Sequence, residues 1–223
     1  MIVYHGSDHV IEKPEYKGGK AHNDYGRGFY MTESEELAKE WACGKGTDGY
    51  ANCYELDIDD LEILELNGEN YNILNWLAVL TKYRTYWQNG SVSQQAKEYL
   101  QENFFVNPEG YDIIRGYRAD DSYFTFAQDF VSGTISLRKL KSAMHLGDLG
   151  MQIVLKSPKA FNRLKFIEAL PASAEIYYEK RVERDRQARQ AYRQSKASEN
   201  SVNDLYIIDI MREEMKNGDS RLQ

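Results

Sequence analysis

Short β-prone runs on either side of a block of helical patterns are the feature that most constrains the fold of this chain. The β-prone runs are residues 2–4, 29–31, 51–58, 111–117, 152–155 and 165–169. The longer helical patterns are residues 70–84, 92–103, 124–131 and 136–144, which follow one another with a single strand between them. A parallel βαβ series would alternate strands with helices throughout, so this order predicts an α+β domain.

Length and charge exclude several classes of protein. A chain of 223 residues fits one medium domain with an addition, and we expect a domain at 1–170 and a helical extension at 171–223, packed on it or protruding from it. The net charge of −7 disfavours broad binding of a nucleic-acid backbone, while a small nucleic-acid substrate in a local cleft stays open. The apolar runs are too short to span a membrane, and the N-terminus lacks a secretion signal. We therefore expect a cytoplasmic protein.

The sequence gives no sign of a metal site or a disulfide framework. Cys43 and Cys53 are the two cysteines of the chain, and two cysteines at this length are predicted to be reduced, buried thiols. Asp57, Asp59 and Asp60 lack the spacing of a calcium-binding EF-hand loop, so they are predicted to be solvated carboxylates at a strand end. A P-loop, an HExxH motif and a GxGxxG motif are also missing.

Two glycine-containing segments carry the candidate chemistry. In residues 4–7, YHGS, the glycine would let a ligand approach the backbone at a strand end, with the His5 ring and the Ser7 hydroxyl beside it. In residues 25–30, YGRGFY, the two glycines allow a tight turn that would present Tyr30 to a flat ring. Each segment taken alone also fits an ordinary structural turn.

Together the two segments resemble the ADP-ribosyltransferase fold in its diphtheria-toxin and poly(ADP-ribose) polymerase branch. That branch has a His-Gly strand end, then a Gly-x-Gly-x-Tyr turn, then a third residue, usually glutamate, that opens a later strand. More closely, the chain is similar to a bacterial family of unknown function within that clan, over roughly residues 1–170. The segments that carry the likeness are YHGS at 4–7, YGRGFYMT at 25–32, LNWLAVL at 74–80, GYRADDSYF at 116–124 and GMQIVLKS at 150–157. The resemblance implies two small packed sheets that flank a cleft for NAD⁺, with helices around them, and NAD⁺ as co-substrate without a metal.

The resemblance also implies roles for individual residues. His5 would hold the adenine-side ribose, and the Gly6 backbone would bind the nicotinamide amide with Ser7 nearby. Tyr30 would stack on the nicotinamide ring. Trp41, eleven residues further on, would supply a second stacking aromatic, although a core residue of the following helix would fit that position equally well.

The third position departs from the family pattern, because the later strand opens with Gln152. A carboxylate there would support the positive charge that develops as the nicotinamide bond breaks, whereas an amide carries no charge. Transfer of a single ADP-ribose unit is therefore favoured over chain elongation. Asp120 and Asp121 would supply the missing carboxylate or cap a helix, and Arg118 would meet the pyrophosphate or pair with one of these aspartates.

These features predict an NAD⁺-dependent mono-ADP-ribosyltransferase, toxin-like or regulatory, with a protein or nucleic-acid acceptor and a cognate antitoxin or regulator as partner. Two alternatives stay open: an NAD⁺ glycohydrolase, with water as acceptor, and a catalytically inactive module that binds NAD⁺ or ADP-ribose. The segment 175–196 holds seven basic and four acidic residues, a local charge of +3. It is predicted to be a solvated helix, with contact to a partner or nucleic acid as the alternative.

Overall fold

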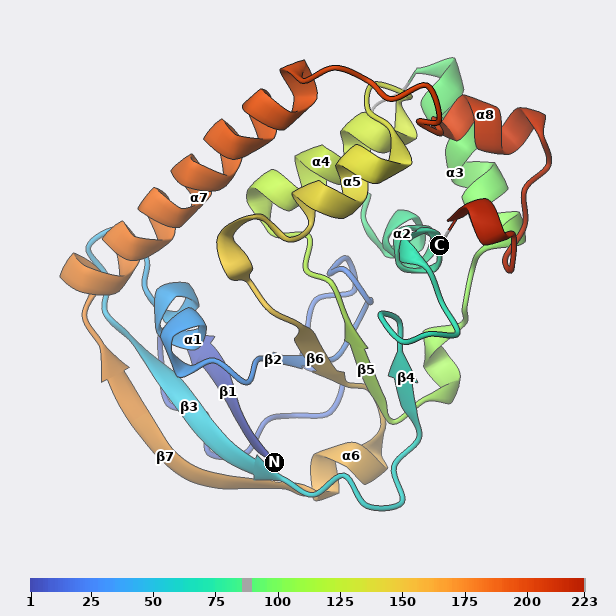
Figure 1. The fold of residues 1–223 in the computed structure, drawn as a ribbon. Coiled ribbons are helices and arrows are strands. Elements are labelled where there is room, and N and C mark those ends of the chain that lie inside the picture. The colour runs from blue at the N-terminus through green and yellow to red at the C-terminus, as the bar shows by residue number, and fades with distance from the viewer. Residues whose placement is uncertain (86–89, 223) are drawn as a thin grey trace.

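The computed structural model describes residues 1–85 and 90–222, and within them the chain forms two small β-sheets with helices around them (Figure 1). The strands are β1 (Ile2–Ser7), β2 (Phe29–Met31), β3 (Gly49–Leu56), β4 (Ile63–Glu65), β5 (Ile113–Gly116), β6 (Gln152–Leu155) and β7 (Leu164–Ala172). The β1 sheet has the order β1–β3–β7 and is antiparallel. The β6 sheet has the order β2–β6–β5–β4, in which β4 and β5 are parallel and the other pairs antiparallel. The predicted α+β class is confirmed.

The structure contains the helices predicted at 70–84, 92–103, 124–131, 136–144 and 175–196, with their ends shifted by a few residues. They are α1 (Glu35–Ala42), α2 (Ile73–Tyr83), α3 (Ser91–Asn103), α4 (Asp121–Val131), α5 (Leu137–Ala143), α6 (Pro158–Asn162), α7 (Ala174–Ala197) and α8 (Ile207–Arg212). Ser34 caps α1 by accepting a hydrogen bond from the Leu37 amide, and Ser136 caps α5 in the same way.

The two sheets meet edge to edge where β1 passes β2. The Tyr4 amide donates to the Thr32 carbonyl oxygen at 2.8 Å, and the Thr32 amide donates to the Tyr4 carbonyl oxygen at 2.9 Å. This pair of bonds brings the end of β1, with His5, beside the end of β2, with Tyr30. The two candidate segments of the sequence are therefore neighbours in space.

The strand β1 continues past His5, where the sequence suggested that it would end. Residues 5–7 pair in register with residues 50–52 of β3, so Gly6 lies inside the ladder. A Cβ atom on Gly6 would lie 2.1 Å from the carbonyl oxygen of Ala38, because α1 packs directly on the strand at this point. The space left by the missing side chain is thus filled by α1, and a ligand could contact Gly6 only through its backbone amide and carbonyl groups.

The β6 sheet separates two apolar clusters. Val154 belongs to the larger cluster, which the helices build, and Ile153 belongs to the smaller cluster, which includes residues of the β1 sheet. Successive residues of a strand face opposite sides, so Gln152 faces the same side as Val154. Tyr30 is the ladder partner of Val154 and packs against the larger cluster. The side chains of Tyr30 and Gln152 therefore share one face of the sheet.

The long helix α7 runs along one side of the molecule for 24 residues, from the end of β7 to α4 and α5 (Figure 1). It contacts α1 as well as α4 and α5. The Tyr192 ring stacks on the Phe126 ring of α4 with 3.9 Å between centroids, and Lys196 forms an ion pair with Asp129 at 2.8 Å. Most other side chains of α7 are exposed or half-buried.

No helix in residues 1–85 and 90–222 has both the length and the apolar character needed to cross a membrane. The two cysteines, Cys43 and Cys53, are buried and free, as their number suggested. Neither takes part in a disulfide that could hold the sheets together, so the edge contact between β1 and β2 depends on backbone hydrogen bonds and packing.

Candidate functional site

The His5 cavity lies where the two sheets meet. It has a volume of about 610 Å³, and His5, Phe29 and Tyr30 line it together with the loop between β1 and β2. The His5 Nδ1 atom lies 2.7 Å from the Tyr30 carbonyl oxygen, and the imidazole packs against the Phe29 ring with 4.4 Å between centroids. Because a carbonyl accepts, Nδ1 must carry the hydrogen, which leaves Nε2 of the neutral ring as an acceptor. Burial lowers the pKa of His5, and the bond to the Tyr30 carbonyl opposes this in part.

The Tyr30 hydroxyl holds the glycine turn that precedes its own strand. It donates to the Gly26 carbonyl oxygen at 2.6 Å and accepts from the Tyr25 amide at 3.1 Å. Gly26 has a φ of 74°, in the left-handed region that favours glycine, as a tight turn requires. Burial raises the pKa of Tyr30, so the hydroxyl stays neutral. The ring is thereby held in place on the side of β2 that packs against the larger cluster.

The Gly6 backbone is directed toward the edge where the sheets meet. Along an antiparallel strand, successive residues turn their amide and carbonyl groups to alternate edges. Tyr4 bonds across to Thr32, so Gly6, two residues later, turns its own groups to the same edge. This is the direction that backbone binding of a ligand amide requires.

Asn52 of β3 organises the loop that follows β1, a role that the sequence analysis missed. Its side chain is fully buried, and Nδ2 donates to the Ser7 hydroxyl at 3.0 Å while Oδ1 accepts from the Ile11 amide at 2.9 Å. The Ser7 hydroxyl in turn donates to the His9 carbonyl oxygen. Ser7 therefore shapes the loop, and this loop lines the His5 cavity. The sequence did contain an indication, because Asn52 is the one amide side chain within the strand segment ANCYEL.

Gln152, the first residue of β6, carries an unmatched acceptor. The residue is 4% exposed, and its Oε1 atom has no hydrogen-bond partner within the described part of the chain. A buried acceptor without a partner costs about 1–3 kcal/mol, so it is a place where a ligand or water donor is favoured. Across the ladder it pairs with Gly116, which is packed against the Tyr25 hydroxyl. Gly116 of β5 therefore lies between Gln152 and Tyr25, the first residue of the YGRGFY segment.

The Arg118 cavity, of about 500 Å³, is a second hollow bounded by α1, the start of α4 and α7. Trp41 and Arg118 both line it, with the guanidinium carbon 3.1 Å from the centroid of the indole ring. Arg118 is 4% exposed, and its Nε and Nη1 atoms have no hydrogen-bond partner among the described residues. Burial lowers the pKa of Arg118 to about 10, so the group is charged at neutral pH. Trp41 is therefore half-buried against a cation rather than a core residue of α1.

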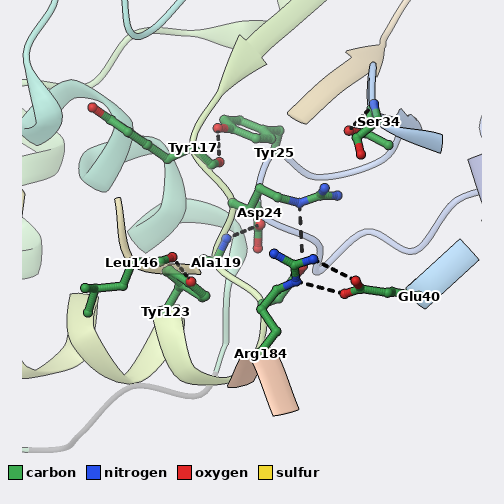
Figure 2. A network of polar contacts seen from close by, with 12 residues as sticks. Asp24, Tyr25, Ser34, Glu40, Tyr117, Ala119, Tyr123, Leu146 and Arg184 are labelled. Carbon is green, nitrogen blue, oxygen red and sulfur yellow. Dashed lines mark hydrogen bonds and ion pairs between the residues drawn. The ribbon is translucent and has the colours of Figure 1, made fainter. Parts of the chain in front are cut away.

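Asp24 ties the glycine loop to the wall of the Arg118 cavity (Figure 2). Its carboxylate accepts from the Ala119 amide at 2.9 Å and from Arg84 Nε at 2.7 Å. Burial raises the pKa of Asp24, and the charge of Arg84 opposes this. The preceding residue, Asn23, lines the His5 cavity. Asn23 and Asp24 therefore connect the His5 cavity to the wall of the Arg118 cavity. Asp24 is not among the residues predicted for the site, although its place directly before the glycine turn in HNDYGRG was a signal.

Asp120 is the residue that precedes α4, and its side chain makes no capping hydrogen bond. Its Oδ2 atom lies 3.5 Å from Arg118 Nε, and the residue lines the Arg118 cavity. The alternative in which Arg118 pairs with an aspartate is therefore observed, at a long distance. Asp121 begins α4, and its side chain lies outside the described part of the structure.

Glu40 and Arg184 close the Arg118 cavity on the α7 side, and neither was predicted (Figure 2). Arg184 donates through Nε and Nη2 to the two carboxylate oxygens of Glu40 at 2.9 and 2.7 Å. A third bond joins Arg184 Nη1 to the Gly147 carbonyl oxygen at 2.6 Å. Glu40 lies three positions after the buried Leu37, which was a signal for its inward side chain. Its partner is 144 positions away and gave no such signal.

The predicted site residues divide between the two cavities. His5 and Tyr30 line one, Trp41, Arg118 and Asp120 line the other, and Gln152 lines neither. Gly6 and Ser7 adjoin the His5 cavity through β1 and the loop after it. In the residues that the structure describes, no group of three or more His, Cys, Asp or Glu side chains could hold a metal ion.

A family model described as a protein of unknown function, DUF3990, matches residues 1–166. No curated protein and no solved structure matches the chain. The matched region contains the residues that line the His5 cavity, whereas α7, which contributes Arg184 to the Arg118 cavity, lies beyond it.

Proposed function

This chain belongs to the DUF3990 family, and we propose that it binds NAD⁺ in the His5 cavity and transfers one ADP-ribose unit to a macromolecular acceptor. The resemblance of residues 4–7 and 25–32 to ADP-ribosyltransferases of the diphtheria-toxin and poly(ADP-ribose) polymerase branch is one support. The observation that carries the proposal is that His5 and Tyr30, from two different strands, line a single cavity. A volume of about 610 Å³ is within the range of small-molecule and cofactor sites.

The surroundings of His5, Gly6 and Tyr30 suit the parts of NAD⁺ that the resemblance assigns to them. The His5 ring is held as an acceptor at Nε2, which suits a ribose hydroxyl. The Gly6 amide and carbonyl face the sheet edge, which suits the donor and acceptor of a carboxamide. The Tyr30 ring is fixed by its hydroxyl bonds, so little side-chain entropy would be lost on stacking with nicotinamide.

The proposed reaction breaks the bond between the nicotinamide nitrogen and ribose C1, with positive charge developing on the ribose. The electron pair of that bond leaves with nicotinamide, and a nucleophilic oxygen or nitrogen of the acceptor then bonds to C1 and loses its proton. Gln152 lines neither cavity, and as an amide it adds no negative charge at the position where the resembling enzymes have a glutamate. Transfer of a single unit at a modest rate is the reaction that this arrangement favours.

A catalytically inactive NAD⁺ or ADP-ribose-binding module is the second candidate. One observation favours it: the carboxylate that could replace the missing glutamate, Asp120, lines the Arg118 cavity and lies near Arg118. The wall of the His5 cavity does include Glu12 and Glu15, but these belong to the loop after β1 rather than to β6. Binding without turnover would then be the function.

The test uses NAD⁺ labelled in the adenylate part, incubated with the protein and a whole-cell lysate, together with a measurement of free nicotinamide. Transfer predicts nicotinamide release and label on protein or nucleic acid. Nicotinamide release without labelled acceptor would contradict transfer and indicate hydrolysis. Binding by calorimetry with neither product would support the inactive module, and no binding would reject both candidates.

The His5 cavity itself is tested with a matched pair of variants. His5→Ala removes the imidazole from the cavity wall, and His22→Ala removes an exposed imidazole from the loop between β1 and β2. We expect His5→Ala to weaken NAD⁺ binding about tenfold or more, because a hydrogen bond between uncharged groups and a ring contact are lost. His22→Ala should leave NAD⁺ binding unchanged. Equal effects would place the ligand elsewhere.

A further inference from the structure

Arg118 carries a buried positive charge that its neighbours match only in part. Its nearest carboxylate, Asp120, is 3.5 Å away and 40% exposed, and two of the three guanidinium nitrogens have no hydrogen-bond partner among the described residues. Stacking on Trp41 stabilises the plane of the group but gives its N–H donors no acceptor. Buried guanidinium groups are usually paired, so this one is suited to an acceptor that arrives from outside the chain.

The start of α4 adds a second source of positive potential to the same cavity. The helix runs for 11 residues, and no side chain caps its first turn in the described structure. Ala119 and Asp120, immediately before the helix, line the cavity beside Arg118. The N-terminus of a helix attracts anions, and the residues of this one that line the cavity lie next to an unmatched arginine.

Three carboxylates also line the cavity, and their pairing decides whether an anion can enter. Glu40 is neutralised by two hydrogen bonds from Arg184. Asp185 is paired with Arg189 at 2.7 Å and accepts from the Ser122 hydroxyl. Asp120 is the one whose pairing is weak, so an incoming anion would displace it from Arg118 toward solvent.

We propose that the Arg118 cavity binds a phosphate group, held by the Arg118 guanidinium and the first amides of α4. A phosphate presents oxygens in several directions, which suits an arginine fork and helix amides that approach from different sides. A planar carboxylate would satisfy the arginine fork alone. This site is separate from the wall that His5 and Tyr30 form, and it does not depend on NAD⁺ being the substrate.

The test is calorimetric titration of the full chain with inorganic phosphate and inorganic pyrophosphate. Wild type binds both, Arg118→Gln weakens binding at least tenfold, and Arg118→Lys, which keeps the charge but loses the fork, gives an intermediate loss. Asp120→Asn strengthens binding severalfold, because it removes the competing negative charge. Arg186→Gln, an arginine of α7 outside the cavity and paired with Glu183, leaves binding unchanged.

Two results would overturn the proposal. One is no saturable binding of either anion by a folded wild-type protein at millimolar concentrations. The other is an equal loss of binding in Arg118→Gln and Arg186→Gln, which would indicate attraction by net charge. Melting curves check that each variant is folded. If Arg118→Gln does not fold, Asp120→Asn still tests the proposal, because it must strengthen binding.

The phosphate can come from the pyrophosphate of a bound dinucleotide or from a separate molecule, and a second titration distinguishes these sources. Pyrophosphate is titrated into protein saturated with NAD⁺. Loss of pyrophosphate binding identifies the dinucleotide as the source, and unchanged binding identifies a separate phosphorylated ligand. If NAD⁺ itself does not bind while pyrophosphate does, the proposed NAD⁺ function fails and the phosphate site stands.

Discussion

Arg184 of α7 donates two hydrogen bonds to the carboxylate of Glu40 on α1, across 144 positions of the sequence. The Glu40 side chain is 2% exposed and the Arg184 side chain 30%. Removal of Arg184 therefore leaves a buried, unpaired charge, whereas removal of Glu40 leaves a charge that water reaches. A solitary buried carboxylate has lost its hydration, whereas a solitary Arg184 keeps contact with water. The pair therefore anchors α7 to the region that the family model matches.

The first prediction follows from that asymmetry. Arg184→Met should lower the free energy of unfolding by about 3 kcal/mol, the lower end for one broken buried pair, and Glu40→Gln should lower it by less. Urea denaturation followed by circular dichroism measures both. Arg186→Met, which breaks an exposed pair on the same helix, serves as the control and should have little effect. A larger loss for Glu40→Gln than for Arg184→Met would contradict this account.

A second prediction separates packing from ligand binding at Gly6. A side chain there would meet the Ala38 carbonyl, so Gly6→Ala should lower the free energy of unfolding by about 2–3 kcal/mol through displacement of α1. Gly110→Ala is the matched control, because a Cβ at that position meets nothing within 4 Å and its φ is not in the left-handed region. Thermal melting compares the two. A stable Gly6→Ala protein with α1 in place would refute the packing argument.

The order of the elements could be predicted from the sequence because hydrophobic period and capping residues are local signals. The helix expected at 175–196 spans Ala174–Ala197, and the helical pattern at 136–144 forms the helix Leu137–Ala143. The end of β1 could not be predicted, because its last residues are held by pairing with β3, some 45 positions away. For the same reason, sequence patterns did not reveal that Trp41 and Arg118 would stack in a cavity apart from His5.

The third prediction concerns pH. Burial lowers the pKa of His5 below its usual value of about 6.5. As the pH falls below about 6.5, the unfolded chain takes up a proton at this histidine while the folded chain does not, until the pH passes the lowered pKa. The free energy of unfolding should therefore decrease over this interval, and His5→Gln should make the decrease smaller. Urea denaturation at neutral pH and at about pH 5 measures the difference. A His5 resonance that titrates at or above its usual value would contradict it.

The fourth prediction distinguishes two roles of Tyr30, support of the glycine turn and stacking on nicotinamide. Tyr30→Phe removes the bonds to Gly26 and Tyr25 and should lower the free energy of unfolding by about 1 kcal/mol, with the ring still able to stack. Tyr30→Ala removes the ring and should weaken NAD⁺ binding by about 1–3 kcal/mol. Calorimetry with NAD⁺ on both folded variants decides between stacking and turn support. If Tyr30→Phe weakens binding as much as Tyr30→Ala, Tyr30 acts by holding the turn.

The last prediction concerns Gln152, whose buried Oε1 lacks a partner. In Gln152→Glu a carboxyl group replaces the amide at almost the same size, and NAD⁺ binding should be preserved. Its negative charge would act mainly on the transition state, so nicotinamide release should increase. Because burial without a hydrogen-bond donor raises the pKa of a carboxyl group, the increase should grow as the pH rises above neutral.

Three further proteins complete this experiment: wild type, Asp120→Asn and Asp121→Asn, each checked by melting curves. Lower nicotinamide release in either aspartate variant would mean that this carboxylate compensates for Gln152 from the start of α4. If release is unaffected in both, the amide of Gln152 acts by orienting the ribose, a slower route that needs no charge. If wild type and Gln152→Glu both bind NAD⁺ and both release no nicotinamide, transfer is rejected. The inactive binding module then accounts for a neutral amide at the position where the resembling enzymes have a glutamate.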